Sequence, residues 1–512
     1  MTPADPDNRA MHDSRDPGAG PLAAIDLGSN SFRLEIGQVD HGHYRRLDYL
    51  KETVRLGAGL DADGRLDEDA AERGLACLAR FAERLKGFAP WQVRAVATQT
   101  LREASNRDQF LERARSVLGH PVEVISGREE ARLIYAGVAH LQPSPLPRLV
   151  IDIGGRSTEL ILGQGRTPST AESFQVGSVA LSLRFFPDGR LTAEAFRAAQ
   201  IAAGAQFEEA LADFAPGQWA EALGSSGTAG SVSQILAAEG VTDGRITAEG
   251  LAWCIGRCIE AGHVDRLDFA ALKPDRRPVL AGGLSILYTL CALLPIESLK
   301  PAKGALRQGV IVELDARLRT EQRPGNLADP RDRSVAQLQH RFAVDAAQAR
   351  RVLRAALALY DQLDDGAAPE RRRELAWAAA LHEVGMVVSH HDHHRHSGYL
   401  LSHADAAGFS QSQQRHLGLL VLGQRGGLRK VEDLLADRAV ADQLRCLRLA
   451  VIACHARVDV SVAGWRLQRA GEGLALSFRR GARSPDPRTL FLLQEEAQAW
   501  QRVGRPGLSL GV

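Results

Sequence analysis

The 512-residue chain has few cysteines and no long apolar run. Its six cysteines form no C-x-x-C pair and no zinc-type spacing, so we interpret them as buried thiols of a reducing compartment. No apolar run approaches the roughly 18 residues that a membrane span needs. Residues 1–20 lack the apolar core of a signal peptide and read as a disordered tail. We therefore expect a cytoplasmic protein without integral membrane association.

The chain also lacks a strong excess of charge of either sign. Its net charge of +1 gives no general case for nucleic-acid binding, and we expect no nucleic-acid partner. The charge is unevenly distributed, however, because residues 319–512 carry roughly +7 and the remainder about −6. A basic C-terminal part would attract a polyanion. A solvated helical surface rich in arginine is an equally good interpretation.

The most informative feature that is present is a short segment that occurs twice. Ile25–Ser31 reads Ile-Asp-Leu-Gly-Ser-Asn-Ser, and Ile151–Ser157 reads Ile-Asp-Ile-Gly-Gly-Arg-Ser. Asp152 follows Asp26 by 126 residues, and the two copies align without a gap. Each copy is an apolar strand that ends in an aspartate, followed by a glycine-containing turn and a second strand. The repeat predicts a duplicated domain whose halves face each other.

These residue types suit phosphate and Mg²⁺. Glycine can adopt positive φ and lets the backbone approach a ligand, while successive turn N–H groups bind anions. Asp26 and Asp152 are hard oxygen ligands of the kind that Mg²⁺ prefers. Four hydroxyl groups add hydrogen-bond donors: Ser29, Ser31, Ser157 and Thr158. One copy alone would favour an ordinary hairpin; the second copy, with its aspartate retained, favours a phosphate clamp.

The order of predicted strands and helices indicates an α/β fold with mixed sheets up to about residue 318. Pro143, Pro145 and Pro147 mark a linker between two halves. From about Pro330 the sequence becomes rich in Ala, Leu and Arg, which predicts a helical domain. We therefore divide the chain into a tail (1–20), two α/β domains (21–140 and 141–318) and a helical C-terminal domain (319–512).

An ordered set of motifs resembles the exopolyphosphatase/guanosine-pentaphosphate phosphohydrolase (Ppx/GppA) family of the actin superfamily. The matching segments are Asp26–Phe32, Arg55–Leu60, Ala97–Arg102, Val124–Ile134, Asp152–Glu159, Gly224–Thr228, Gly304–Gly309, Leu381–Gly385 and His394–Leu400. The resemblance implies two actin-like (RNase H-like) domains in tandem, with the active site in the cleft between them. A mostly helical, HD-like C-terminal domain would follow.

The resemblance also implies roles for individual residues. Glu130 corresponds to the family's proposed catalytic base, although its place near a helix start would by itself lower its pKa. Asp152, Glu159 and Asp26 are the expected Mg²⁺ ligands. The expected phosphate-binding residues are Gly28, Ser29, Asn30, Ser31, Arg102, Gly154, Gly155, Ser157, Thr158, Ser226, Gly227 and Thr228.

Two positions depart from the family pattern. Arg156 stands where a glycine or alanine is usual, and its guanidinium either binds a second phosphate or points to solvent. Lys303 replaces a common aspartate and puts any metal or nucleotide contact there in doubt.

The C-terminal domain carries a histidine cluster: His382, His390, His391, His393, His394, His396 and His403. Because Glu383 replaces the Asp of an HD pair, we interpret it as a relict HD fold without a metal. The domain would guide a chain-like substrate or form a dimer interface.

We expect an exopolyphosphatase that releases terminal orthophosphate from inorganic polyphosphate by Mg²⁺-assisted attack of water, as a homodimer. The alternative is hydrolysis of guanosine pentaphosphate, which uses the same chemistry on a nucleotide. A kinase of the same superfamily is a more distant alternative, because a kinase has no use for a glutamate that positions water. A regulatory phosphate-binding module would keep the glycine turns without needing Glu130.

Overall fold

The computed structural model describes residues 20–321, 329–363, 369–471, 473–479, 485–503 and 507–511. The predicted disordered tail lies outside these residues, apart from Gly20. The chain divides into two compact units, Met1–Ala328 and Asp329–Val512. The predicted boundary at residue 318 is corrected to 328, because helix α10 (Leu306–Glu321) runs through it without a break.

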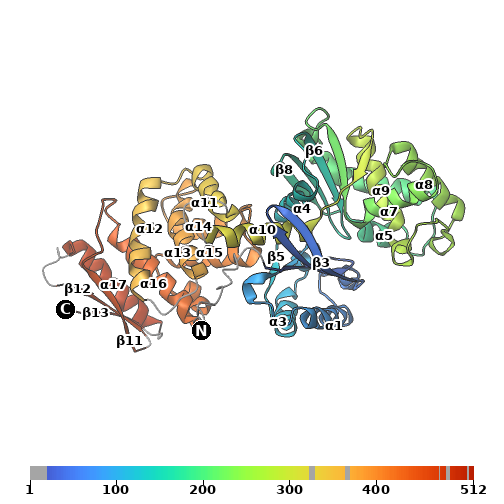
Figure 1. The fold of residues 1–512 in the computed structure, drawn as a ribbon. Coiled ribbons are helices and arrows are strands. Elements are labelled where there is room, and N and C mark those ends of the chain that lie inside the picture. Colours follow the sequence, from blue (N-terminus) through green and yellow to red (C-terminus); the bar gives the residue numbers. More distant parts are fainter. Residues whose placement is uncertain are drawn as a thin grey trace, which may run out of the picture. The chain divides into compact units, whose positions relative to one another are not determined.

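The first unit contains two five-stranded sheets of the same topology; in Figure 1 the first is coloured blue to cyan, and the second cyan to green with β10 in yellow. Their strand orders are β3-β2-β1-β4-β5 and β10-β9-β6-β7-β8, so each sheet has its first strand in the centre. The strands are β1 (Leu22–Leu27), β2 (Phe32–Asp40), β3 (His43–Glu52), β4 (Val93–Ala97), β5 (Val122–Val124), β6 (Pro147–Ile153), β7 (Thr158–Gln164), β8 (Thr167–Phe174), β9 (Glu221–Ser225) and β10 (Leu299–Pro301). The repeated sheet confirms the predicted duplication.

Helices flank these sheets. They are α1 (Glu68–Arg84), α2 (Gln99–Glu103), α3 (Arg107–Leu118), α4 (Gly127–Leu141), α5 (Ser178–Phe185), α6 (Ala193–Phe207), α7 (Ser226–Ala238), α8 (Ala248–Ala261), α9 (Arg277–Leu293) and α10. Short 3-10 helices are η2 (Leu56–Gly59), η3 (Pro90–Gln92), η4 (Glu208–Phe214), η5 (Val264–Arg266) and η6 (Pro274–Arg276). The segment that follows β4 forms the short helix α2.

The sheet register places the repeated aspartates at equivalent positions. Asp26 lies at the end of β1 opposite Arg33 of β2, and Asp152 lies at the end of β6 opposite Glu159 of β7. All six residues of β1 are buried, as expected for a central strand covered on both faces. The glycine turns follow directly after these two strands, so both turns start from rigid structure.

Helices α4 and α10 pack against each other and join the two sheets. Helix α4 follows the first sheet in sequence but contacts β7 and β8, whereas α10 follows the second sheet and contacts β1 and β2. Their shared core includes Val96 from the first sheet, Ile161 from the second, and Leu133 and Val310 from the helices. Each of these helices therefore packs on the sheet of the other predicted α/β domain.

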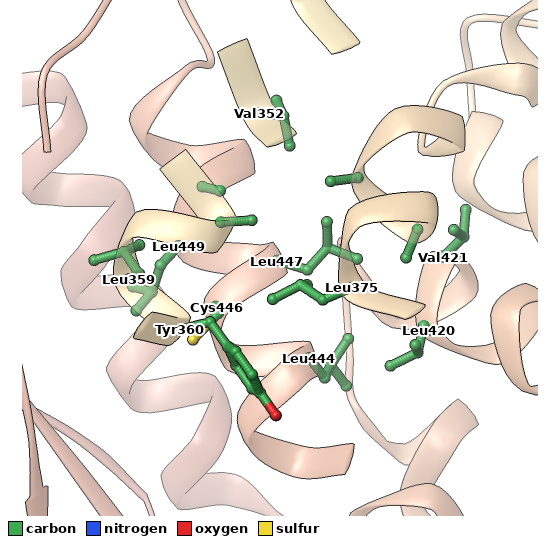
Figure 2. Close-up of a cluster of buried hydrophobic side chains, with 14 of the residues drawn as sticks. Val352, Leu359, Tyr360, Leu375, Leu420, Val421, Leu444, Cys446, Leu447 and Leu449 are labelled. Atoms are coloured by element: carbon green, nitrogen blue, oxygen red, sulfur yellow. The ribbon is translucent and has the colours of Figure 1, made fainter. Parts of the chain in front are cut away.

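The second unit is mostly helical, as predicted. Its elements are α11 (Pro330–Arg341), α12 (Ala346–Tyr360), η7 (Asp361–Leu363), α13 (Pro369–Leu381), η8 (Val384–Val387), α14 (His393–His403), α15 (Gln411–Gly423), η9 (Arg429–Ala436), α16 (Arg438–Ala453), β11 (Trp465–Ala470), β12 (Gly473–Phe478), α17 (Pro487–Arg502) and β13 (Leu508–Leu510). Figure 2 shows its core, in which Leu359 of α12, Leu375 of α13, Leu420 of α15 and Leu447 of α16 converge.

A buried ion-pair cluster holds α10 in the first unit. Glu313 accepts hydrogen bonds from Arg94 of β4 (2.8 Å), from Arg317 (2.6 Å) and from Arg132 of α4. Burial by itself would raise the pKa of Glu313, but Arg132, Arg317 and Arg94 together hold this pKa well below its usual range. This stabilisation is therefore present at neutral pH and is lost as the pH falls below the ordinary carboxyl pKa of about 4.

We predict that Glu313→Gln lowers the free energy of unfolding by about 3 kcal/mol at pH 7, because it leaves buried guanidinium groups without their shared partner. Chemical denaturation of both proteins measures this difference. Glu249→Gln, which removes an exposed carboxylate from α8, is the control and changes stability by less than about 0.5 kcal/mol. Equal stabilities of the Glu313 variant and the control would contradict a structural role for the cluster.

Candidate active site

The two glycine turns face each other across a small cavity of the first unit. The backbone N–H of Gly154 donates to the carbonyl of Ser157 (2.9 Å) and closes the second turn. None of Gly28, Gly154 and Gly155 has a positive φ, so the turns do not use the left-handed conformation that glycine allows. They are glycines because of close approach: a Cβ on Gly155 would lie 3.1 Å from the Cβ of Ser29 in the opposite turn.

The cavity has a volume of about 80 Å³ and brings together most of the predicted site residues. The predicted residues that line it are Asp26, Gly28, Ser29, Asn30, Ser31, Glu130, Asp152, Gly154, Gly155, Ser157, Ser226 and Gly227. Ser31 has a buried hydroxyl without a hydrogen-bond partner among the described residues, which is an available donor for a ligand. The repeated segments therefore meet at one site.

Four predicted residues do not line the cavity: Arg102, Thr158, Glu159 and Thr228. The hydroxyl of Thr158 donates to the carbonyl of Val176 (2.6 Å), and that of Thr228 donates to the carbonyl of Ile153 (3.2 Å). Because each hydroxyl has one proton and uses it on a backbone carbonyl, these threonines support the turns rather than donate to a ligand. The sequence pattern does not show in which direction such a hydroxyl points.

Glu130 is held at the cavity by Arg102. The Nη1 atom of Arg102 donates to Oε2 of Glu130 at 2.8 Å and also to the carbonyl of Ile125. The pKa of Glu130 is raised to about 7: burial is the largest cause, Arg102 opposes it, and the nearby Asp26 and Asp152 add to the rise. The expected lowering of this pKa at the helix start is therefore wrong, because desolvation outweighs the helix dipole.

The other buried carboxylates behave in the same way. Burial raises the pKa of Asp152, and burial together with Glu130 and Asp152 raises the pKa of Glu159 well above its usual value. Oε1 of Glu159 accepts a hydrogen bond from Ser173 (2.8 Å). Of the predicted metal ligands, Asp26 and Asp152 line the cavity and are hard oxygen donors, whereas Glu159 lies outside its lining.

Three arginines at the cavity were not predicted. Arg33 lies 3.7 Å and Arg307 3.4 Å from the Asp26 carboxylate, measured between Nη1 and Oδ2. Arg276 lies against the first turn of α7, since a Cβ on Gly227 would overlap its guanidinium. Burial and the nearby Arg33 lower the pKa of Arg276, which makes no ion pair among the described residues.

The sequence contained a signal for two of these arginines. Arg33 lies on the strand opposite Asp26, and Arg307 belongs to the Gly304–Gly309 motif. Arg276 comes from the short helix η6, which is far away in sequence and has no motif of its own. All three line the cavity and supply cationic groups for an anionic ligand.

Arg156 neither points to solvent nor enters the phosphate cavity. Its Nη2 donates to Oε2 of Glu103 (2.7 Å) and its Nη1 donates to the carbonyl of Gly57 (3.1 Å), so it connects the second glycine turn to the first α/β domain. Both interpretations of this departure are therefore wrong. The side chain of Lys303 is exposed and does not line the cavity.

In the second unit, the histidines do not gather into a metal centre among the residues that the structure describes. Across the described residues of both units, the carboxylates around the first cavity included, no group of three or more His, Cys, Asp or Glu side chains has an arrangement that would hold a metal ion. All six cysteines are free and buried. No helix in the described ranges is both long and apolar enough to cross a bilayer.

The duplicated sheets and the phosphate-type cavity between them define an actin-like two-domain protein with a helical C-terminal region. Residues 36–318 match the Ppx/GppA phosphatase family, and residues 331–496 match domain III of the Ppx/GppA phosphatases. The chain therefore belongs to the Ppx/GppA phosphatase family.

Solved structures are similar to the first part of this chain. A protein described as exopolyphosphatase-like is 26% identical, with a TM-score of 0.53, over 58% of this chain and 98% of its own. An exopolyphosphatase from Cytophaga hutchinsonii is 23% identical, with a TM-score of 0.52, over 58% of this chain and 98% of its own. The Ppx/GppA enzyme from Aquifex aeolicus is 26% identical, with a TM-score of 0.49, over 57% and 98%.

We predict that Mg²⁺ raises the Tm of the protein more at pH 8 than at pH 6. Folding raises the pKa of Glu130 to about 7. The folded protein therefore loses stability as the pH rises through this value, because the buried carboxyl group must ionise. A cation that binds the ionised carboxylates offsets this loss and competes with protons at the lower pH. Thermal unfolding with and without MgCl₂ at both pH values measures the effect.

The matched variants for this measurement are Asp152→Asn and Asp213→Asn. Asp152 is buried at the cavity, whereas Asp213 is exposed on η4. We expect the Mg²⁺-dependent rise in Tm to shrink in the first variant and to remain in the second. The same rise in both variants would show that Mg²⁺ acts elsewhere.

Proposed function

We propose that this protein is an exopolyphosphatase, which releases orthophosphate from the end of a polyphosphate chain by Mg²⁺-assisted attack of water. The observation that carries the proposal is the position of Glu130 at the cavity between the two phosphate turns, with a pKa of about 7. A general base works best when its pKa is close to the working pH. The family relationship supports a phosphatase reaction and leaves the substrate to be argued from the site.

The cavity provides what phosphoryl transfer needs, which is positioning and charge neutralisation. The turn N–H groups and the hydroxyl of Ser31 would bind the terminal phosphoryl oxygens. Arg33 and Arg276 would neutralise the negative charge of the phosphates next to it. Asp152, Glu159 and Asp26 would hold Mg²⁺, directly or through water, and the bound cation would supply further charge neutralisation.

Glu130 would act on the attacking water. Its Oε2 accepts the Arg102 hydrogen bond, so Oε1 is the oxygen that takes a proton. As the water oxygen forms a bond to the terminal phosphorus, its proton moves to Oε1 and the bridging P–O bond breaks. The shortened polyphosphate leaves as an anion, and the positive charge of Arg33 and Arg276 stabilises the charge that develops on it.

We predict that Glu130→Gln lowers kcat by roughly 10²–10⁴, the usual range for a lost general base, with little change in KM. Phosphate release from polyphosphate measures both constants. The control is Glu129→Gln, because Glu129 is buried one residue away but pairs with Arg132 instead of facing the cavity. Similar losses of kcat in both variants would show that Glu130 has only a structural role.

The pH profile separates a base from a structural group. In the free wild-type enzyme, kcat/KM should fall as the pH decreases through about 7, when Glu130 becomes protonated. Arg102 is the cation that lowers this pKa, so Arg102→Ala should move the acidic limb to higher pH. An acidic limb that stays in place in this variant would contradict the assignment.

The uneven charge favours polyphosphate over guanosine pentaphosphate. Residues 319–512 carry roughly +7, and a long polyanion releases counterions at each cationic group that it contacts. The alternative substrate is compact and would contact few such groups. A kinase reaction is disfavoured because Glu130 would activate water, which would hydrolyse the nucleotide instead of letting its phosphate pass to an acceptor.

We predict that affinity for long-chain polyphosphate falls more steeply with salt than affinity for tripolyphosphate, and that long chains release phosphate faster than guanosine pentaphosphate does. Binding measured at two salt concentrations with the Glu130→Gln protein, together with phosphate release by the wild type, tests both statements. Equal salt slopes with faster release from guanosine pentaphosphate would assign the enzyme to the nucleotide instead.

A further inference from the structure

Arg156 begins a chain of side-chain hydrogen bonds that ends at Glu130. This residue departs from the family pattern, and the reaction proposed above gives it no part. Its Nε and Nη2 atoms donate to Oε2 of Glu103 at 3.0 and 2.7 Å. Because both bonds reach the same oxygen, the other carboxylate oxygen of Glu103 can accept from a different donor.

Helix α2 continues the chain from Glu103 toward the cavity. Nε2 of Gln99 donates to Oε1 of Glu103 at 2.5 Å, and Oε1 of Gln99 accepts from Nε and Nη2 of Arg102 at 2.9 and 2.6 Å. Residues three and four positions apart share one face of a helix, which is why these three side chains meet. A carboxylate only accepts and a guanidinium only donates, so the Gln99 amide between them has one possible orientation.

The last link joins Arg102 to the base. Nη1 of Arg102 donates to Oε2 of Glu130 (2.8 Å) and to the carbonyl of Ile125 (3.0 Å). Nε, Nη1 and Nη2 of Arg102 therefore all have acceptors, and Gln99 holds one side of the guanidinium plane while Glu130 and Ile125 hold the other. The orientation of Glu130 thus depends on where the Gln99 amide is held.

A second contact of Arg156 reaches the first glycine turn. Its Nη1 donates to the carbonyl of Gly57 (3.1 Å), and the N–H of Gly57 donates to the carbonyl of Ser29 (2.8 Å). Gly57 leaves room for this contact, since a Cβ there would lie 2.9 Å from Cδ of Arg156. Arg156 itself does not line the cavity, so it acts on the site through its neighbours.

We propose that Arg156 is a positioning residue of the phosphatase reaction, which orients Glu130 through the hydrogen-bond chain along α2. The inference rests on the proposed function, because it needs Glu130 to act on water. With the glycine or alanine that is usual at position 156, Glu103 would lose its cationic partner and the Gln99 amide would no longer be fixed. In this chain the second glycine turn therefore both borders the phosphate cavity and holds the base in place.

Phosphate release from polyphosphate by Arg156→Ala tests the proposal. We expect kcat to fall roughly three- to tenfold, the size of one lost hydrogen bond, with little change in KM because Arg156 lies outside the cavity lining. Arg156→Lys keeps a cation next to Glu103 and should recover part of the loss. The control is Arg128→Ala, which removes an exposed ion pair with Glu172 and should leave kcat unchanged.

A double variant separates positioning from an effect on stability alone. In the Glu130→Gln protein the chain has no base to orient, so the addition of Arg156→Ala should leave the residual kcat unchanged. Glu103→Ala removes the next link and keeps the proposal testable if Arg156→Ala does not fold. It should lower kcat by a similar factor in the wild type and, again, not in the Glu130→Gln protein.

Three results would overturn the positioning role and leave the proposed reaction intact. They are equal losses of kcat in the wild-type and Glu130→Gln backgrounds, a rise in KM in place of the fall in kcat, and wild-type kcat in both Arg156→Ala and Glu103→Ala. Wild-type kcat in Glu130→Gln itself would instead contradict the proposed reaction, and this role with it.

Discussion

The repulsion between buried carboxylates is the constraint on which the cleft of the first unit depends. Asp26, Asp152, Glu130 and Glu159 share a region from which water is largely excluded, and burial is the largest cause of the raised pKa of three of them. A folded protein tolerates such a group only with compensating charge nearby. Arg102 offsets part of the repulsion at Glu130 and Glu159, and Arg33 does so at Asp152.

The rest of the first unit holds these charges in place. The aspartates occupy the ends of the central strands, and the ion pairs around Glu313 fix the helices that join the two sheets. The ion pair between Arg156 and Glu103 adds a direct link from the second phosphate turn to the first α/β domain. Arg156, the one large residue in a turn of small residues, therefore has a structural role.

Sequence reasoning predicted the parts that depend on local pattern. The repeat located both turns, the order of predicted strands and helices indicated an α/β fold with mixed sheets, and the family resemblance supplied most of the lining residues. It did not predict the direction of the Thr158 hydroxyl or the arrival of Arg276 from η6, because both depend on packing between distant segments. It also gave the wrong sign for the pKa of Glu130, since the helix position is local and the burial is not.

The same physical principle leads to opposite results in the two units. In the first unit, burial acts on carboxylates and keeps Glu130 able to accept a proton near neutral pH. In the second unit, burial acts on His382 and His393 and removes their positive charge, so that they become neutral acceptors. Burial therefore keeps Glu130 partly protonated near neutral pH and keeps His382 and His393 uncharged. Burial disfavours the charged form of each group, which is the carboxylate of Glu130 and the imidazolium of the two histidines. The charge of each of these groups therefore depends on tertiary structure as well as on residue type.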